Sequence, residues 1–302
     1  LIIMFKLNNK NNLGIFLGFS GYLIYVLLDS LIKKYLIFSY PVFEINFFIS
    51  LFTLIPIFLT LFFLNSWHVL INNKIHIQLF RGALGMLCGA LIINSFKQHS
   101  FSEIYPVLFS APLILTIFSY FILKEKVGIR RWSAVLIGFV GVLIVSRPGT
   151  VHFTWSLFGL FIAAIILATN IVIIRSLAKS QSALAFAFYG SISGLILSSI
   201  LASKNFIYPS NNDLLIFLIC GIICGIAALC ITSASKILES SLFAPIQYVQ
   251  LVSGFIFGYF FFGDIPDIYE IFGSIVIIFS GLFIIYRQNK LGIKSLVKDQ
   301  PS

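Results

Sequence analysis

Charged residues are so rare and so unevenly spaced that this feature most constrains how the 302-residue chain can fold. Only 10% of the residues are charged, against about 25% in an ordinary soluble domain, and 59% are hydrophobic. This composition excludes a soluble enzyme, a disordered tail and a secreted disulfide scaffold, because a surface in water needs more polar side chains. Ten charge-free stretches are candidates for membrane spans: 13–28, 45–67, 82–96, 104–123, 132–146, 153–174, 180–203, 214–235, 240–263 and 271–286.

The ten stretches are predicted to be helices because their apolar residues run continuously and do not alternate as in a barrel strand. The expected fold class is therefore an all-α integral membrane protein with ten transmembrane helices. With the N-terminus in the cytoplasm, 15 of the 20 Lys and Arg residues fall on the cytoplasmic side. Both termini are then expected inside, and the first span is expected to stay uncleaved because no small-residue cleavage site follows it.

The two halves of the chain resemble each other at an offset of about 140 residues. At this offset Gly82 and Pro106 of the first half align with Gly221 and Pro245 of the second. The expected units are a first five-helix repeat over residues 1–148, a second over 149–288 and a cytoplasmic tail over 289–302.

Five is an odd number, so the two repeats must enter the membrane with opposite polarity. The loop charges agree, since residues 124–131 after the fourth stretch are basic and residues 264–270 after the ninth are acidic. Inverted repeats with a solute site between them are the usual construction of secondary transporters.

Several short motifs recur in order across both halves. The second half contains Ala244-Pro245, Tyr248, Phe262-Gly263-Asp264, Pro266-Asp267, Gly273 and Gly281, and the first contains Arg81-Gly82, Pro112, Leu123-Lys124-Glu125, Trp132, Gly138 and Gly141. This pattern resembles the EamA family of the drug/metabolite transporter superfamily over about residues 13–288. The resemblance implies two inverted five-helix repeats around a central substrate cavity, and some relatives in intracellular bacteria resemble S-adenosylmethionine uptake carriers. One departure is Ile49, which stands after Glu44 where many relatives have an Arg.

Polar side chains beside prolines are the first candidates for substrate contact. Gln247, Tyr248 and Gln250 follow Pro245, and Tyr105 precedes Pro106. Proline leaves a backbone carbonyl without its helical donor, so a break inside a membrane is expected to face protein or a wet cavity. The alternative is that these side chains only form hydrogen bonds between helices, which contribute about 0.6 kcal/mol each on average.

Four further polar residues lie within or at the mouths of apolar stretches: Asp29, Arg81, Asn94 and Asn170. A charge at the bilayer centre costs at least about 2.5–3.5 kcal/mol, so a retained one usually faces a cavity. Asp29 and Asn170 are interpreted either as cavity or gate residues or as interfacial caps. Arg81 either draws anions or anchors its helix to headgroups.

The motifs of several other functions are missing from the sequence. Cys88, Cys220, Cys224 and Cys230 lie in apolar runs without metal-ligand spacing, so no metal or other cofactor is expected. No GxxxxGK[ST], HExxH or GxSxG motif occurs, and the net charge of +10 is assigned to membrane orientation and not to nucleic-acid binding.

The sequence is therefore expected to encode not an enzyme but a secondary transporter of a small-molecule metabolite in the bacterial inner membrane, working by alternating access. S-adenosylmethionine uptake is the preferred substrate hypothesis. An amino-acid or drug exporter of the same family, a membrane enzyme and a non-transporting membrane scaffold remain as alternatives. The direction of transport, the coupling ion and the oligomeric state stay open.

Overall fold

A computed structural model describes residues 9–71, 74–122, 128–148, 154–177, 181–238 and 240–290. These residues form helices joined by short connections and contain no strand. The α-helices are α1 (Asn9–Leu31), α2 (Val42–Phe63), α3 (Ile75–Ser95), α4 (Phe101–Leu108), α5 (Ser110–Phe121), α6 (Ile129–Ser146), α7 (Trp155–Leu177), α8 (Ala183–Ala202), α9 (Asn211–Ile237), α10 (Ser240–Phe262) and α11 (Ile268–Lys290). A π-helical turn, Ile32–Leu36, extends α1, and a 3-10 turn, Trp67–Leu70, follows α2.

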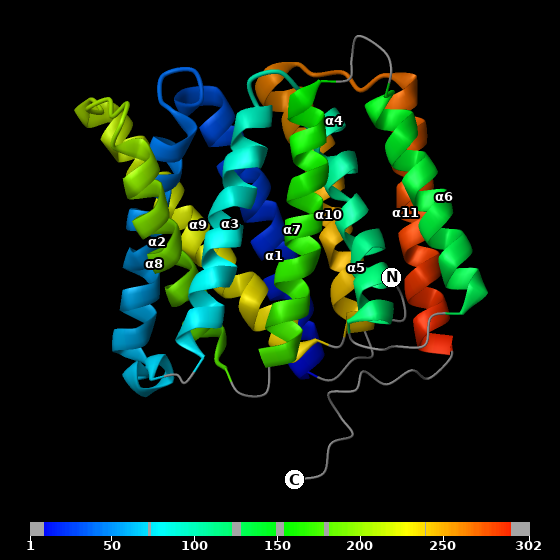
Figure 1. Ribbon diagram of the computed structural model, residues 1–302, viewed down its shortest axis with the longest axis horizontal. Coiled ribbons are helices and arrows are strands. Elements are labelled where there is room, and N and C mark those ends of the chain that lie inside the picture. The colour runs from blue at the N-terminus through cyan, green and yellow to red at the C-terminus, as the bar shows by residue number, and fades with distance from the viewer. Residues whose placement is uncertain are drawn as a thin grey trace.

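The helices stand side by side as a bundle, with α2 and α8 at one side and α6 and α11 at the other (Figure 1). Helix α1 lies inside the bundle and packs mainly against α9 and α10, whereas α3 packs against α7 and α8. Among the described residues, seven segments are long and apolar enough to cross a bilayer: Asn12–Leu36, Val42–Phe63, Ile75–Ser95, Phe101–Phe118, Trp155–Ile174, Ala183–Ala202 and Asn211–Ser235. The same part of the chain holds three shorter apolar helical segments, Trp132–Ser146, Ile246–Phe262 and Ile268–Phe283. The protein is thus an all-helical, multi-pass membrane protein.

The predicted break in the fourth stretch is present. Helix α4 ends and α5 begins around Phe109, whose backbone (φ −71°, ψ 0°) leaves the regular helical geometry. Pro106 precedes this point and Pro112 follows it, so one backbone donor is missing on each side of the break. The same expectation at Pro245 is wrong, because α10 continues through it from Ser240 to Phe262. Pro245 lies near the start of α10, where few intrahelical bonds have yet formed.

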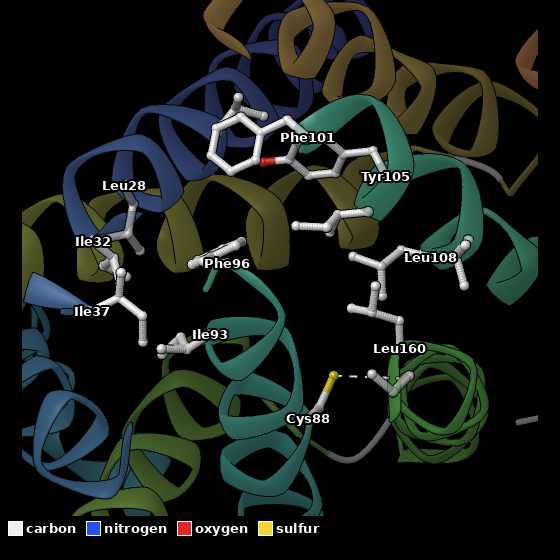
Figure 2. Close-up of a cluster of buried hydrophobic side chains, with 14 of the residues drawn as sticks. Leu28, Ile32, Ile37, Cys88, Ile93, Phe96, Phe101, Tyr105, Leu108 and Leu160 are labelled. Atoms are coloured by element: carbon white, nitrogen blue, oxygen red, sulfur yellow. Dashed lines mark hydrogen bonds between the residues drawn. The ribbon is translucent and has the colours of Figure 1, made fainter. Parts of the chain in front are cut away.

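The interior is built from large apolar side chains at the level where α1, α3 and α4 meet. Phe96, Phe101 and Tyr105 are almost fully buried there (Figure 2). Cys88 lies in the same cluster and donates to the Ala163 carbonyl oxygen at 3.6 Å, which joins α3 to α7. The cluster fixes how α4 is seated against α1 and α3, and so positions Tyr105.

Two groups of sequence predictions fall partly outside the described residues. The described residues do not include 123–127, which contain part of the basic loop. They also do not include 291–302, which contain most of the predicted tail.

Candidate functional site

A stripe of polar side chains follows one face of α1 and its π-helical extension. Its members are Tyr22, Tyr25, Asp29 and Lys33, at spacings of three, four and four residues. Residues at these spacings share one face of a helix. Tyr22, Tyr25 and Asp29 are only partly buried, although α1 lies inside the bundle. The stripe therefore gives the interior a polar wall, and it is the base of the candidate site.

Asp29 is held by a tyrosine from another helix. The Tyr105 hydroxyl on α4 donates to Oδ2 of Asp29 at 2.8 Å. The Tyr105 ring reaches this position because it packs directly against Gly254 of α10, where any Cβ would overlap the ring. Two of the predicted site residues, Asp29 and Tyr105, are thus brought together.

Arg81 enters the same region from α3. Its Nη2 donates to the Phe186 carbonyl oxygen of α8, and its guanidinium carbon lies 5.4 Å from the centre of the Phe186 ring. Its Nε is buried and has no hydrogen-bond partner among the described residues. Tyr25 interacts electrostatically with both Asp29 and Arg81, so the tyrosine connects the acidic and basic parts of the site.

Asn170 of α7 lies across from α3. Its Nδ2 is the nearest atom, at 4.0 Å, to the point where a side chain on Gly85 would begin. Its Oδ1 is buried and has no hydrogen-bond partner among the described residues. Like Arg81 Nε, this oxygen is a buried polar atom whose hydrogen-bonding capacity is unused among the described residues.

The predicted residues of α10 divide into two groups. Gln247 hydrogen-bonds with Tyr22 and so joins the stripe. The Tyr248 ring stacks on Phe109 at the α4–α5 break, with 5.0 Å between ring centres and 23° between planes. The Tyr248 hydroxyl points at Gly281 of α11, which has no side chain to block it. Gln250 is partly buried one turn further along.

Asn94 lies apart from these residues. It is exposed in the last turn of α3, whereas Asp29, Tyr105, Arg81 and Gln247 lie within the bundle. The structure does not bring it into contact with the stripe.

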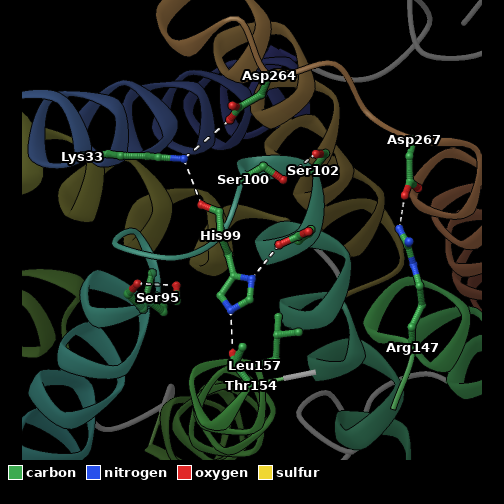
Figure 3. Close-up of polar contacts among 12 residues, drawn as sticks. Lys33, Ser95, His99, Ser100, Ser102, Arg147, Thr154, Leu157, Asp264 and Asp267 are labelled. Carbon is green, nitrogen blue, oxygen red and sulfur yellow. Dashed lines mark hydrogen bonds and ion pairs between the residues drawn. The ribbon is translucent and has the colours of Figure 1, made fainter. Parts of the chain in front are cut away.

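Lys33 closes one end of the bundle. Its Nζ lies 3.5 Å from Oδ2 of Asp264 and donates to the His99 carbonyl oxygen at 2.9 Å (Figure 3). The same ammonium lies 4.9 Å and 4.7 Å from the ring centres of Phe101 and Phe262. Lys33 therefore ties α1 to the α3–α4 connection and to the end of α10.

Two further polar links lie at this end. His99 Nδ1 shares a hydrogen bond of 2.6 Å with Oε2 of Glu103, and its Nε2 lies 2.7 Å from the Thr154 hydroxyl at the start of α7 (Figure 3). Arg147, after α6, forms an ion pair with Asp267, before α11. We call the Lys33–Asp264, His99–Glu103–Thr154 and Arg147–Asp267 contacts the end network.

The electrostatics of Asp267 follow from its neighbours. Partial burial raises its pKa, but the Glu270 backbone N–H, at 2.9 Å from Oδ1, and the Arg147 guanidinium lower it more. The net pKa of Asp267 lies below its ordinary value. The carboxylate thus stays ionised and keeps its bond to Arg147.

Sequence reasoning missed several members of the site. Tyr22 and Tyr25 were overlooked, but their spacing from Asp29 along one helical face is a signal that could have found them. His99 lies between two charge-free stretches of the sequence, and its burial depends on the packing of α4 and α7, which the sequence does not reveal. Glu44, noted only for the missing Arg after it, is buried and accepts a bond at 3.0 Å from the Ile207 backbone N–H.

No group of three or more His, Cys, Asp or Glu side chains suited to a metal ion occurs in the described part of the chain. The site chemistry is hydrogen bonding and charge, supplied by side chains from α1, α3, α4, α7 and α10.

Comparisons with known proteins give a matching family and a similar fold. The model of the EamA-like transporter family matches the chain twice, over residues 12–147 and 154–287. A solved crystal structure is similar in fold, with a TM-score of 0.67 at 15% identity, covering 92% of this chain and 98% of the other.

Two curated relatives are similar in sequence. An S-adenosylmethionine uptake transporter of Rickettsia prowazekii (strain Madrid E) is 31% identical over 184 residues, 61% of this chain and 63% of that protein. A riboflavin transporter of Vibrio cholerae serotype O1 is 26% identical over 185 residues, 61% of this chain and 62% of that protein. The chain thus matches slightly less than two thirds of the length of either relative.

Proposed function

Because this chain belongs to the EamA-like transporter family, we propose that it is a secondary carrier that moves a small organic metabolite across the bacterial inner membrane. Uptake of S-adenosylmethionine is the preferred activity. The similarity to the Rickettsia transporter supports this substrate, and the similarity to a riboflavin transporter makes riboflavin the first competitor to test.

The proposed architecture is ten spans in two inverted repeats, residues 1–148 and 149–288, with both termini in the cytoplasm. The double family match supports two related halves. In this architecture α4 and α5 together make one broken span, as their shared charge-free stretch suggests. The end network is then periplasmic, because Lys33, His99, Arg147, Asp264 and Asp267 all belong to connections predicted on that side.

One observation carries the proposal: polar side chains from both halves meet inside an otherwise apolar bundle. Tyr22 of the first half hydrogen-bonds with Gln247 of the second, and Tyr248 of the second half stacks on Phe109 of the first. Polar groups inside a membrane protein usually face the bundle interior or a water-filled cavity, and they often mark a solute path. Alternating access would open the two halves at one end while the other end is closed.

The proposed substrate contacts are Asp29, Arg81, Tyr105, Asn170, Gln247, Tyr248 and Gln250. Asn94, exposed at the end of α3, is proposed to contact the solute only on entry.

The test is uptake of radiolabelled S-adenosylmethionine by the purified chain in liposomes, with riboflavin and amino acids as competitors. Saturable uptake above that of empty liposomes is expected. Gln247→Ala should lower it about tenfold, because losing a hydrogen bond to a solute costs on the order of 1 kcal/mol or more. Gln98→Ala, at an exposed glutamine beyond α3, is the control and should leave uptake unchanged. Flux equal to empty liposomes for every solute would refute the proposal.

A further inference from the structure

Two opposite charges face the interior of the bundle without forming a pair. Asp29 on α1 has Tyr105 as its hydrogen-bond partner, and Arg81 on α3 donates to a backbone carbonyl. The ion pairs found among the described residues join other groups. An acid and a base this deep usually neutralise each other or a ligand, because an uncompensated charge is expensive in a membrane.

Lys33 is the cation best placed to neutralise Asp29, since it lies one turn further along the same face. It is engaged elsewhere, by Asp264, the His99 carbonyl oxygen and the rings of Phe101 and Phe262. The stripe therefore separates into an outer part, where Lys33 belongs to the end network, and an inner part, where Asp29 has the Tyr105 hydroxyl as its hydrogen-bond partner and no cationic partner among the described residues.

The two charges are held apart by the geometry of α1 and α3. Asp29 interacts electrostatically with Cys88 of α3, so Asp29 lies near the level of Cys88 along that helix. Arg81 precedes Cys88 by seven residues, a rise of about 10 Å along the helix axis. Tyr25 interacts with both charges and Tyr22 lies beside it, so tyrosines occupy the level between them.

Two side chains in this region carry unused hydrogen-bonding atoms. Arg81 Nε and Asn170 Oδ1 are both buried without partners among the described residues. Gly85, one turn from Arg81 on α3, has no atom nearer than 4.0 Å to the start of a side chain there. A solute group at this level would meet a guanidinium donor and an amide acceptor, as an α-amino-acid head would require.

We propose that Asp29, with Tyr22, Tyr25 and Tyr105, binds the cationic centre of a zwitterionic solute while Arg81 binds its carboxylate. The inference rests on the proposed transport function and adds to it the charge type of the solute and the residue that selects it. Tyrosine rings suit the cationic end, because aromatic faces attract ammonium and sulfonium groups. Asp29 is thus the residue that distinguishes a cationic solute from a neutral analogue of the same shape.

A pair of probes isolates this charge. S-adenosylmethionine carries a sulfonium, and S-adenosylhomocysteine is the same molecule without the methyl group and its positive charge. Binding of each to the purified full-length chain is measured by competition, and the ratio of dissociation constants is compared between variants. The native chain should prefer the sulfonium by at least about tenfold, the ratio given by one modest charge interaction.

Asp29→Asn keeps the shape of the side chain and removes its charge, so the ratio should fall to within about twofold. Tyr105→Phe removes the hydrogen bond that orients Asp29 and should give an intermediate ratio. Asp213→Asn is the matched control, since Asp213 binds Tyr40 and Ser210 at the start of α9, away from the stripe. It should keep the native ratio. Arg81→Gln should weaken both probes equally, because both retain the carboxylate.

The outcomes separate the inference from the function it rests on. If the native chain neither binds nor transports either probe, the proposed substrate fails. If the native chain transports S-adenosylmethionine but Asp29→Asn keeps the full preference for the sulfonium, or weakens both probes equally, the function stands and the inference is overturned. An Asp29→Asn protein that does not fold leaves Tyr105→Phe as the deciding variant, and an unchanged ratio there also overturns the inference.

Discussion

At the scale of single residues, the interior of this protein shows how an ionisable side chain is kept in an apolar helix. Asp29 has one hydrogen bond from Tyr105 and aromatic neighbours on its own helical face. Its carboxylate stands out in the sequence because it interrupts an apolar run. The partner does not stand out, because Tyr105 reaches Asp29 only through the seating of α4 against Gly254 of α10.

The ion pair between Arg147 and Asp267 gives a prediction about pH. Because the pKa of Asp267 is lower in the folded than in the unfolded chain, the pair stabilises the fold above the unfolded pKa of about 3.9. This contribution is lost as the pH falls through the lower, folded pKa. The Asp267 side chain is 42% exposed, so screening limits the effect to about 0.5 kcal/mol.

Thermal unfolding of detergent-purified protein tests this prediction. Asp267→Asn should have a slightly lower melting temperature than the native chain at pH 7, and the two curves should converge below about pH 4. Gln98→Ala, at an exposed glutamine beyond α3, changes no ionisable group and serves as the control. A difference that persists unchanged to pH 3 would contradict the role given to the pair.

At the scale of helices, α6 and α11 are packed through two glycines. A Cβ on Gly141 would lie 2.9 Å from the Gly273 carbonyl oxygen, and one on Gly273 would lie 2.8 Å from the Gly141 carbonyl oxygen. Gly141→Ala or Gly273→Ala should therefore push the helices apart and destabilise the fold by about 1–3 kcal/mol. The double variant should cost less than the sum, because the first substitution already opens the contact.

The measurement is the apparent melting temperature of each variant in one detergent. Gly85→Ala is the matched control, since a methyl group there meets nothing closer than 4.0 Å. If Gly141→Ala has the melting temperature of the native chain while Gly85→Ala has a lower one, the glycine contact does not hold α6 and α11 together.

The helices were largely predictable from the sequence, because each charge-free stretch coincides with one helix, apart from 104–123, which α4 and α5 share. The break near Phe109 was also predictable, since Pro106 and Pro112 both weaken one short segment. The continuous helix through Pro245 was not predictable, because the free-energy cost of a proline depends on its distance from the start of the helix. Pairings such as Gly141 with Gly273 depend on which helices become neighbours, and hydropathy does not contain that information.

At the scale of the whole molecule, the end network joins the two halves at one end of the bundle. Lys33 and Arg147 of the first half pair with Asp264 and Asp267 of the second, and His99 reaches Thr154 (Figure 3). Ion pairs between the two halves can break and form again, so they can close this end reversibly. Under the proposed mechanism, opening this end must break these contacts, so their strength sets the share of molecules open there.

Lys33→Met tests that role, because it keeps the length of the side chain and removes its charge. Loss of a partly buried ion pair worth about 1 kcal/mol should raise the open share roughly fivefold.

The reporter is a Ser102→Cys substitution in a chain whose four native cysteines are replaced, since Ser102 is buried beneath the network. Its labelling by a membrane-impermeant thiol reagent should be several-fold faster with Lys33→Met. Lys34→Met removes the neighbouring exposed charge and should label at the native rate. Equal rates in all three proteins would mean that Lys33 does not hold this end closed.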